Sequence, residues 1–186
     1  MKKILILLCI VILCNIGLSA QSNKSSDLDQ AKGILLRLDS IAKNAIGKNF
    51  CDFESVTLDG KAISKKDLKG KVTLVDMWFV NCSPCIAEMG GFIELYGKLK
   101  DNKEFQFFSF TRDYPEVAQK AVEKYKIPYI VCPVSSEDIY RMNFGCGFPT
   151  KIIIDKEGKI VFFRTGGAID RDKEMKEIED IIKQML

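Results

Sequence analysis

Apolar residues recur along the chain at two spacings, one typical of helices and one typical of buried strands. From residue 28 to residue 45 the spacing is helical, with Leu28, Ala31, Ile34, Leu35, Leu38, Ile41, Ala42 and Ala45 on one face. This predicts an amphipathic helix that packs on the domain, or alternatively binds a partner. Continuous apolar runs follow in "KVTLVDMWFV", "EFQFFSFTRD" and "PYIVCPV". Such runs indicate strands that are covered on both faces of a sheet.

Helix signals lie between these strands. Residues 86–99 can form a helix, although Gly90-Gly91 is expected to weaken its middle. "PEVAQKAVEKYK" predicts a helix opened by Pro115 at its first turn. "SEDIYRMNFG" predicts a short helix that ends at Gly145. A last helix, capped by Asp170, is expected to run to the C-terminus.

Two hairpins complete the predicted set of elements. "FCDFESVTLDGKAIS" alternates and breaks at Asp59-Gly60, and "TKIIIDKEGKIVFFRTG" breaks at Glu157-Gly158, which are both turn signals. Strands that alternate with helices, followed by a closing hairpin and helix, predict an α/β fold with a sheet covered on both faces. The additional N-terminal helix precedes that fold.

The first twenty residues do not belong to this pattern. Two lysines precede an apolar run from Ile4 to Ile16, and small residues follow as far as Ala20. This is the arrangement of a secretory signal peptide cleaved after Ala20. The run is shorter than the ~20 residues that a membrane span needs, so an uncleaved N-terminal tether is the less favoured interpretation.

Length and composition fit one folded domain after this leader. The chain has 186 residues, of which 47% are hydrophobic and 28% charged. We divide it into a signal peptide (1–20), a polar leader with an amphipathic helix (21–48) and a folded domain (49–186). Loss of Lys2 and Lys3 with the signal leaves 26 basic residues against 25 acidic ones, a net charge of +1. That balance gives no support to nucleic-acid binding.

Cysteine usage points to redox chemistry outside the cytoplasm. Two of the seven cysteines leave with the signal peptide, and the five that remain are Cys51, Cys82, Cys85, Cys132 and Cys146. An odd number in an exported, periplasmic protein means that at least one thiol is free or pairs outside the chain. In an oxidising compartment a CxxC pair is expected to exchange disulfides.

The CxxC motif falls between an apolar strand and a helix. A thiolate in the first helical turn faces unpaired backbone N–H groups and the positive end of the helix dipole, which lower its pKa. Cys82 would then be the exposed nucleophile, and Cys85, one turn inside, would resolve the mixed disulfide. Pro84 between them fixes backbone angles without costing a helical hydrogen bond.

These residues give the sequence a family resemblance. "VTLVDMWFVNCSPC", "GFPTKIIIDKEGKIV" and the order of elements between them resemble the thioredoxin fold, and more closely its exported TlpA/ResA-like thiol-disulfide oxidoreductases. The resemblance covers residues 50–186. It implies a thioredoxin-like mixed sheet with helices on both faces, and a reductase of exported proteins or apocytochromes that receives electrons from a membrane partner.

The resemblance also implies roles for single residues. Cys82 matches the family's nucleophile and Cys85 its resolving cysteine, and Asp76 matches a buried carboxylate whose raised pKa would let it exchange the proton of Cys85. Trp78 matches the aromatic residue below the disulfide. Pro149 matches the cis-proline that faces it.

Substrate binding is expected along the same surface. Beside the cis-proline, the backbone of Phe148 would pair with an extended substrate peptide. The substrate-binding set is therefore Pro149, Phe148, Trp78, Ser83 and Pro84. Several residues depart from thioredoxin itself, namely Asn81 in place of a second tryptophan, Ser83 in place of glycine and Gly90 in place of proline. These departures affect the expected substrate range and potential, and leave the exchange chemistry intact.

Two accessory residues are less clearly functional. Glu88 matches an acidic residue that often follows the CxxC in TlpA-like proteins, but we expect it to be a solvated helix residue rather than a catalytic one. Cys146 is expected to be a small apolar loop residue, with a third redox thiol as the alternative. Cys51 and Cys132 are expected to be buried thiols on strands, and a mutual disulfide is the alternative.

Other functional classes fit the sequence less well. A four-cysteine zinc site would need a second CxxC pair, and the chain has no histidine. A thiol peroxidase would carry threonine where Phe79 stands. A redox-inactive peptide-binding module would not need both Cys82 and Cys85. We therefore expect neither a metal nor an organic cofactor, and we expect thiol- or disulfide-containing exported proteins as partners.

Overall fold

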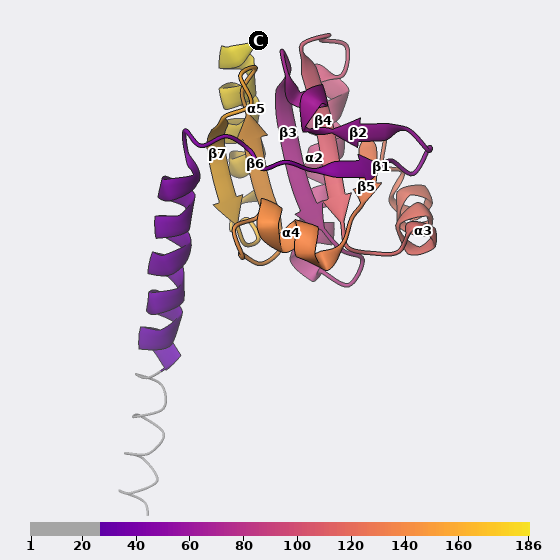
Figure 1. The fold of residues 1–186 in the computed structure, drawn as a ribbon. Helices are drawn as coiled ribbons and strands as arrows, with labels where there is room; N and C mark the ends of the chain where they lie inside the picture. The colour runs from indigo at the N-terminus through magenta and orange to yellow at the C-terminus, as the bar shows by residue number, and fades with distance from the viewer. Residues whose placement is uncertain (1–26) are drawn as a thin grey trace, which may run out of the picture. The chain divides into compact units, whose positions relative to one another are not determined.

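A five-stranded mixed sheet organises the domain in the computed structural model, which describes residues 27–186 (Figure 1). Its strands are β3 (Val72–Trp78), β4 (Phe105–Thr111), β5 (Ile130–Pro133), β6 (Thr150–Ile154) and β7 (Ile160–Thr165). The order across the sheet is β5-β4-β3-β6-β7. Strands β3, β4 and β5 are parallel, whereas β6 runs antiparallel to both β3 and β7. Every residue of the central strand β3 is buried, as its continuous apolar run predicts.

Four helices accompany this sheet. They are α2 (Ser83–Leu99), α3 (Pro115–Tyr125), α4 (Ser136–Met142) and α5 (Arg171–Met185). Helices α2 and α5 lie together behind the sheet in Figure 1, and α4 lies in front of it. Pro115 opens α3, and Asp170 caps α5 by accepting a hydrogen bond from the Lys173 N–H, both as predicted. The thioredoxin-like mixed sheet with helices on both faces is thereby confirmed.

A small hairpin precedes the main sheet. Strands β1 (Glu54–Val56) and β2 (Ala62–Ser64) pair antiparallel and lead into a 3₁₀ turn, η1 (Lys65–Leu68). Gly60 adopts a φ of +86° in the loop between them, a conformation that glycine adopts without strain. The second predicted hairpin is β6–β7. The predicted turns at Asp59-Gly60 and Glu157-Gly158 are therefore confirmed.

Two predictions about helices are wrong in detail. Helix α4 ends at Met142 rather than at Gly145, because Phe144 and Gly145 turn with φ of 58° and 72°. Helix α2 begins at Ser83 and continues through Gly90-Gly91. A Cβ on Gly91 would lie 2.7 Å from Cγ of Met175 on α5, so the glycine permits the close approach of the two helices.

The N-terminal helix spans residues 27–45, as the apolar spacing predicts. Contacts between Cα atoms divide the chain into a unit that ends at Ser40 and a unit from Ile41 to Leu186. In the first unit the side chains of Leu28, Ile34 and Leu35 are exposed. Packing of this helix on the domain stays a prediction. The proposed signal peptide, residues 1–20, lies outside the described residues. Within residues 27–186 no helix has the length and apolar character needed to cross a membrane.

Candidate active site

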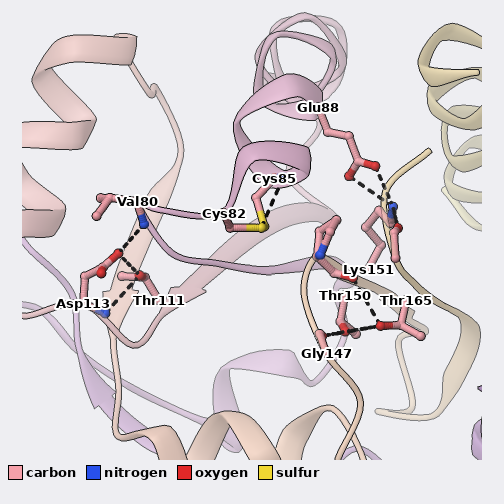
Figure 2. Close-up of a disulfide and its surroundings, with 12 residues drawn as sticks. Val80, Cys82, Cys85, Glu88, Thr111, Asp113, Gly147, Thr150, Lys151 and Thr165 are labelled. Carbon is pink, nitrogen blue, oxygen red and sulfur yellow. Dashed lines mark hydrogen bonds and ion pairs between the residues drawn. A yellow bond between two sulfur atoms is a disulfide. The ribbon is translucent and has the colours of Figure 1, made fainter. Parts of the chain in front are cut away.

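The two cysteines of the CxxC motif form a disulfide at the start of α2 (Figure 2). Cys82 is the N-cap residue of the helix, Cys85 lies in its first turn, and their Cα atoms are 5.3 Å apart. Pro84 occupies the first turn, where no intrahelical N–H bond is lost. The strand, the N-cap and the helix therefore bring Cys82 and Cys85 together as the sequence predicts.

The two sulfur atoms differ in their hydrogen bonding rather than in exposure. Cys82 is 5% exposed and Cys85 is 4% exposed, so the prediction of an exposed nucleophile is wrong for this disulfide form. The backbone N–H of Cys85 donates a hydrogen bond to Sγ of Cys82 at 3.3 Å. A thiolate at the same position would receive this bond together with the favourable field of the helix N-terminus. The geometry therefore favours negative charge on Cys82.

A cis peptide bond joins Phe148 to Pro149, which confirms the cis-proline. The loop around it is held by a hydrogen bond from the Thr150 hydroxyl to the Gly147 carbonyl oxygen at 2.7 Å (Figure 2). The Gly166 N–H also donates to the Pro149 carbonyl oxygen at 2.8 Å. Within residues 27–186, Phe148 makes no backbone hydrogen bond. Its peptide groups are thus available to an extended ligand.

Trp78 supports the site from within the core. It is buried at the end of β3 and belongs to the same apolar cluster as Cys82 and Cys85. Because Trp78 is 1% exposed, it offers no open surface to a substrate, and its place below the disulfide stays a prediction. Ser83 and Pro84, by contrast, are exposed in the first turn of α2. They remain available for substrate contact.

Asp76 is buried in β3, as the sequence predicts. Burial, together with the nearby Glu88 carboxylate, raises its pKa to about 8, although Lys151 acts in the opposite direction. Its Oδ1 atom has no hydrogen-bond partner in the described part of the chain. A carboxyl with this pKa can take up and release a proton near neutral pH.

A buried ionic cluster lies beside the site, and sequence reasoning missed it. Lys151 Nζ donates to both carboxylate oxygens of Glu88, at 3.0 and 3.1 Å, and lies 3.0 Å from Oε1 of Glu174. It also donates to the Gly166 carbonyl oxygen at 2.9 Å, and the Ala168 N–H donates to Glu88 at 2.5 Å. Figure 2 shows Glu88 one turn beyond the disulfide, with Lys151 opposite. The prediction that Glu88 is solvated is wrong, since it is 3% exposed.

The cluster fixes a loop against the CxxC turn. A Cβ on Gly167 would lie 2.8 Å from Cβ of Pro84, so this loop approaches the first turn of α2 closely. Its neighbours on either side, Gly166 and Ala168, are the residues that hydrogen-bond to Lys151 and Glu88. A lysine inside the apolar strand "TKIII" and the pair Gly166-Gly167 are the sequence signals from which this arrangement could have been suspected.

The other three cysteines in the described part of the chain are thiols. Burial raises the pKa of Cys132, on β5, to about 12, which makes it a poor nucleophile. Cys51 is partly exposed and precedes β1, so its predicted place on a buried strand is wrong. Cys146 is buried in the turn after α4, and its role as a third redox thiol stays a prediction. The alternative Cys51–Cys132 disulfide is absent from the described structure.

Residues 27–186 contain no group of three or more His, Cys, Asp and Glu side chains arranged to hold a metal ion. Polar side chains beside the disulfide instead form hydrogen bonds with one another, as Lys151 does with Glu88. The chemistry that the arrangement itself supports is thiol-disulfide exchange at Cys82 and Cys85.

Comparison with known proteins agrees with this geometry. A family model described as Redoxin matches residues 45–182. The chain belongs to the Redoxin family. The thiol-disulfide oxidoreductase ResA of Bacillus anthracis is 36% identical over 121 residues, which cover 64% of this chain and 69% of that relative. ResA of Bacillus cereus is 30% identical over 144 residues, 77% of this chain and 80% of the relative.

Solved structures place this Redoxin-family chain in the thioredoxin fold. The thioredoxin domain of a thiol-disulfide oxidoreductase from Bacteroides vulgatus superimposes with a TM-score of 0.63 at 30% identity, and covers 74% of this chain and 98% of that domain. A solution structure described as a putative protein disulfide isomerase from Bacteroides thetaiotaomicron gives 0.67 at 26% identity, with 76% and 89% covered. The TlpA/ResA-like resemblance is confirmed, and the protein is a thiol-disulfide oxidoreductase.

Proposed function

We propose that this Redoxin-family protein reduces disulfides in exported proteins, with Cys82 as nucleophile and Cys85 as resolving cysteine. The observation that carries the proposal is the N-cap position of Cys82, whose sulfur accepts the Cys85 N–H. That position stabilises a thiolate on Cys82 and leaves Cys85 inside the helix. The assignment of the two roles follows from this asymmetry.

The reaction consists of two thiolate displacements. The Cys82 thiolate attacks one sulfur of the substrate disulfide, forms a mixed disulfide and releases the other substrate sulfur as a thiolate. Cys85 then loses its proton to Asp76 and attacks Cys82 Sγ, which releases the second substrate sulfur. The substrate gains two electrons and the protein ends with the Cys82–Cys85 disulfide. Asp76, with a pKa of about 8, returns the proton to a departing thiolate.

Substrate binding takes place beside the disulfide. An extended segment pairs with the free peptide groups of Phe148 next to the cis-Pro149, in the manner of an added strand. Ser83 and Pro84 contact the segment from the first turn of α2. This places the substrate sulfur opposite Cys82.

The cellular setting is part of the proposal. The signal-like residues 1–20 direct the chain out of the cytoplasm, to the periplasm, with an uncleaved tether as the alternative. The substrates are then exported proteins or apocytochromes. A membrane partner supplies the two electrons that return the disulfide to the dithiol, and no metal or organic cofactor takes part.

The first test follows single turnovers of the reduced protein with a disulfide-linked peptide. Cys82→Ser abolishes reduction, whereas Cys85→Ser accumulates a mixed disulfide between Cys82 and the peptide, detected by mass spectrometry. Cys132→Ser is the matched control and reacts like the parent, because the Cys132 thiol is buried and its raised pKa makes it a poor nucleophile. Normal turnover in either CxxC variant contradicts the proposal.

The direction of the reaction is tested by the reduction potential. Titration against glutathione, with alkylation to trap the thiols, is expected to give a value near the roughly −270 mV of thioredoxin. A value near roughly −120 mV would make the protein an oxidase. If no pair titrates, a redox-inactive binding module becomes the better description. Turnover of hydrogen peroxide, rather than of a peptide disulfide, would point to a thiol peroxidase.

A further inference from the structure

An arginine is stacked between two aromatic rings beside the disulfide. The guanidinium carbon of Arg112 lies 4.0 Å from the ring centroid of Phe79 and 5.0 Å from that of Phe148. The two rings contact each other edge to face, with centroids 5.0 Å apart. Cation–π contacts of this kind hold a guanidinium in a defined place.

All three residues lie at one end of the sheet. Phe79 follows β3 and accepts a backbone hydrogen bond from Cys82 at 3.0 Å, while Phe148 precedes cis-Pro149. Arg112 follows β4, the parallel neighbour of β3. The cluster therefore borders both the nucleophile and the expected substrate strand, although its members are more than thirty residues apart in sequence.

The loop that carries Arg112 is tied to the CxxC loop. The Asp113 carboxylate accepts hydrogen bonds from the Val80 N–H and from the Thr111 hydroxyl, both at 2.8 Å (Figure 2). Both bonds end on Oδ2 of Asp113, the residue that follows Arg112 in sequence. They also keep the backbone on both sides of Arg112 in place beside Phe79.

The charge of Arg112 is left unpaired by the described chain. Its side chain is exposed, and it forms no ion pair with any residue from 27 to 186. The other arginines of the domain, by contrast, pair with carboxylates: Arg141 with Asp138, Arg164 with Glu177 and Arg171 with Asp172. A planar, preoriented guanidinium without a partner matches a carboxylate, to which it can donate two parallel hydrogen bonds.

We infer that Arg112 is a specificity-determining residue that selects substrates with a carboxylate side chain next to the reactive cysteine. The inference rests on the proposed function, because the carboxylate is recognised while the substrate strand lies along Phe148. The two rings orient the guanidinium, and the guanidinium fixes the substrate. The partner class is therefore an acidic segment of a thiol- or disulfide-containing protein.

The test uses three disulfide-linked peptides that differ only in the residue beside the cysteine, which is Glu, Gln or Lys. Single-turnover rates of the reduced full-length protein are expected to be about fivefold higher for the Glu peptide than for the Gln peptide at low salt, and lowest for the Lys peptide. A fivefold ratio corresponds to about 1 kcal/mol. The ratio is expected to shrink at high salt, since the contact is exposed.

The variants show which group causes the preference. Arg112→Gln brings the Glu/Gln rate ratio close to one, and Arg112→Lys retains part of it, because the charge stays while the planar stacking is lost. Comparing each ratio with that of the parent cancels the intrinsic reactivity of the peptides. The control Lys100→Gln removes an equal charge at the C-terminal end of α2. This position is roughly 25 Å from the CxxC turn at 1.5 Å per residue, so the variant is expected to keep the parent ratio.

The outcomes separate the inference from the proposed function. If the parent protein reduces none of the three peptides, the proposed function fails. If it reduces them and the Glu peptide reacts no faster than the Gln peptide, the selection by Arg112 is overturned. A preference for the Glu peptide that survives in Arg112→Gln overturns it as well, because another group then supplies the charge.

Discussion

Burial makes Asp76 a proton store at the pH where thiol exchange takes place. An exposed aspartate would be ionised at neutral pH, but the pKa of Asp76 lies about 8 because β3 is covered on both faces and Glu88 is nearby. Lys151 lies opposite Asp76 on the neighbouring strand β6 and lowers the pKa of Asp76. It offsets the rise only in part, since its charge is already paired with Glu88. The burial that suits Asp76 to the proposed proton exchange therefore also costs stability at neutral pH.

Asp76 should make stability depend on pH in a defined window. Between its ordinary pKa of 3.8 and the raised value of about 8, the native state holds a proton that the unfolded chain has released. The stabilisation due to this group is complete below about pH 4 and is lost as pH rises through about 8, by up to ~1.4 kcal/mol per pH unit. Urea titrations at pH 5 and pH 8 should show that the parent protein loses more stability over this range than Asp76→Asn. Parallel pH profiles for the two proteins would show that Asp76 is ionised at neutral pH in the folded state.

At the residue scale, the sequence predicts the groups that the chemistry requires but not the groups around them. Cys82 and Cys85 follow from a motif with a physical reason for each position, and cis-Pro149 follows from the family resemblance. Glu88 was expected in solvent because an isolated glutamate on a helix usually lies there. Its burial depends on Lys151 from a distant strand, and a pairing across 63 positions leaves no local pattern.

At the scale of elements, turn and cap residues predict where most strands and helices lie. Gly60, Pro115 and Asp170 each act through their own backbone or side chain, so their effects are visible in sequence. Gly91 is different. From sequence alone, the pair Gly90-Gly91 predicts only a less stable helix, because the helix that packs against it is not known. The structure shows that Gly91 serves the contact between α2 and α5.

Two glycines in α2 offer a matched comparison of this point. Gly91→Ala places a methyl group 2.7 Å from Met175 and should destabilise the fold by about 1–3 kcal/mol, as overpacked sites do. Gly97→Ala, in the same helix, meets no atom within 4 Å and should stabilise it by about 0.5–1 kcal/mol. Urea midpoints of the two oxidised variants measure the difference. Equal gains in both variants would mean that Met175 moves aside at little cost.

At the scale of the whole molecule, the site is assembled from loops that are far apart in the chain. The CxxC turn, the loop after β4 and the cis-proline loop meet because the parallel pair β3–β4 and the antiparallel pair β3–β6 bring their ends together. Sequence reasoning could place each loop at a strand end. It could not place Arg112 between Phe79 and Phe148, because that requires the strand order of the sheet.

The limits of the folded domain can also be tested at this scale. Gly47 and Phe50 donate backbone hydrogen bonds to the carbonyl oxygens of Ile160 and Gly158, at 2.8 and 2.9 Å, and Ala45 and Phe50 are buried. A chain that starts at Ile41 keeps these contacts and should unfold cooperatively, close to the urea midpoint of the chain from Gln21. A chain that starts at Cys51 loses them, together with the burial of Phe50, and should be less stable by about 3–5 kcal/mol, comparable to the removal of a buried phenylalanine side chain. Peptide-disulfide reduction should follow the same order, because the CxxC turn depends on an intact sheet. If the chain from Ile41 were as unstable as the chain from Cys51, residues 21–40 would have to stabilise the domain, and the N-terminal helix would belong to the fold.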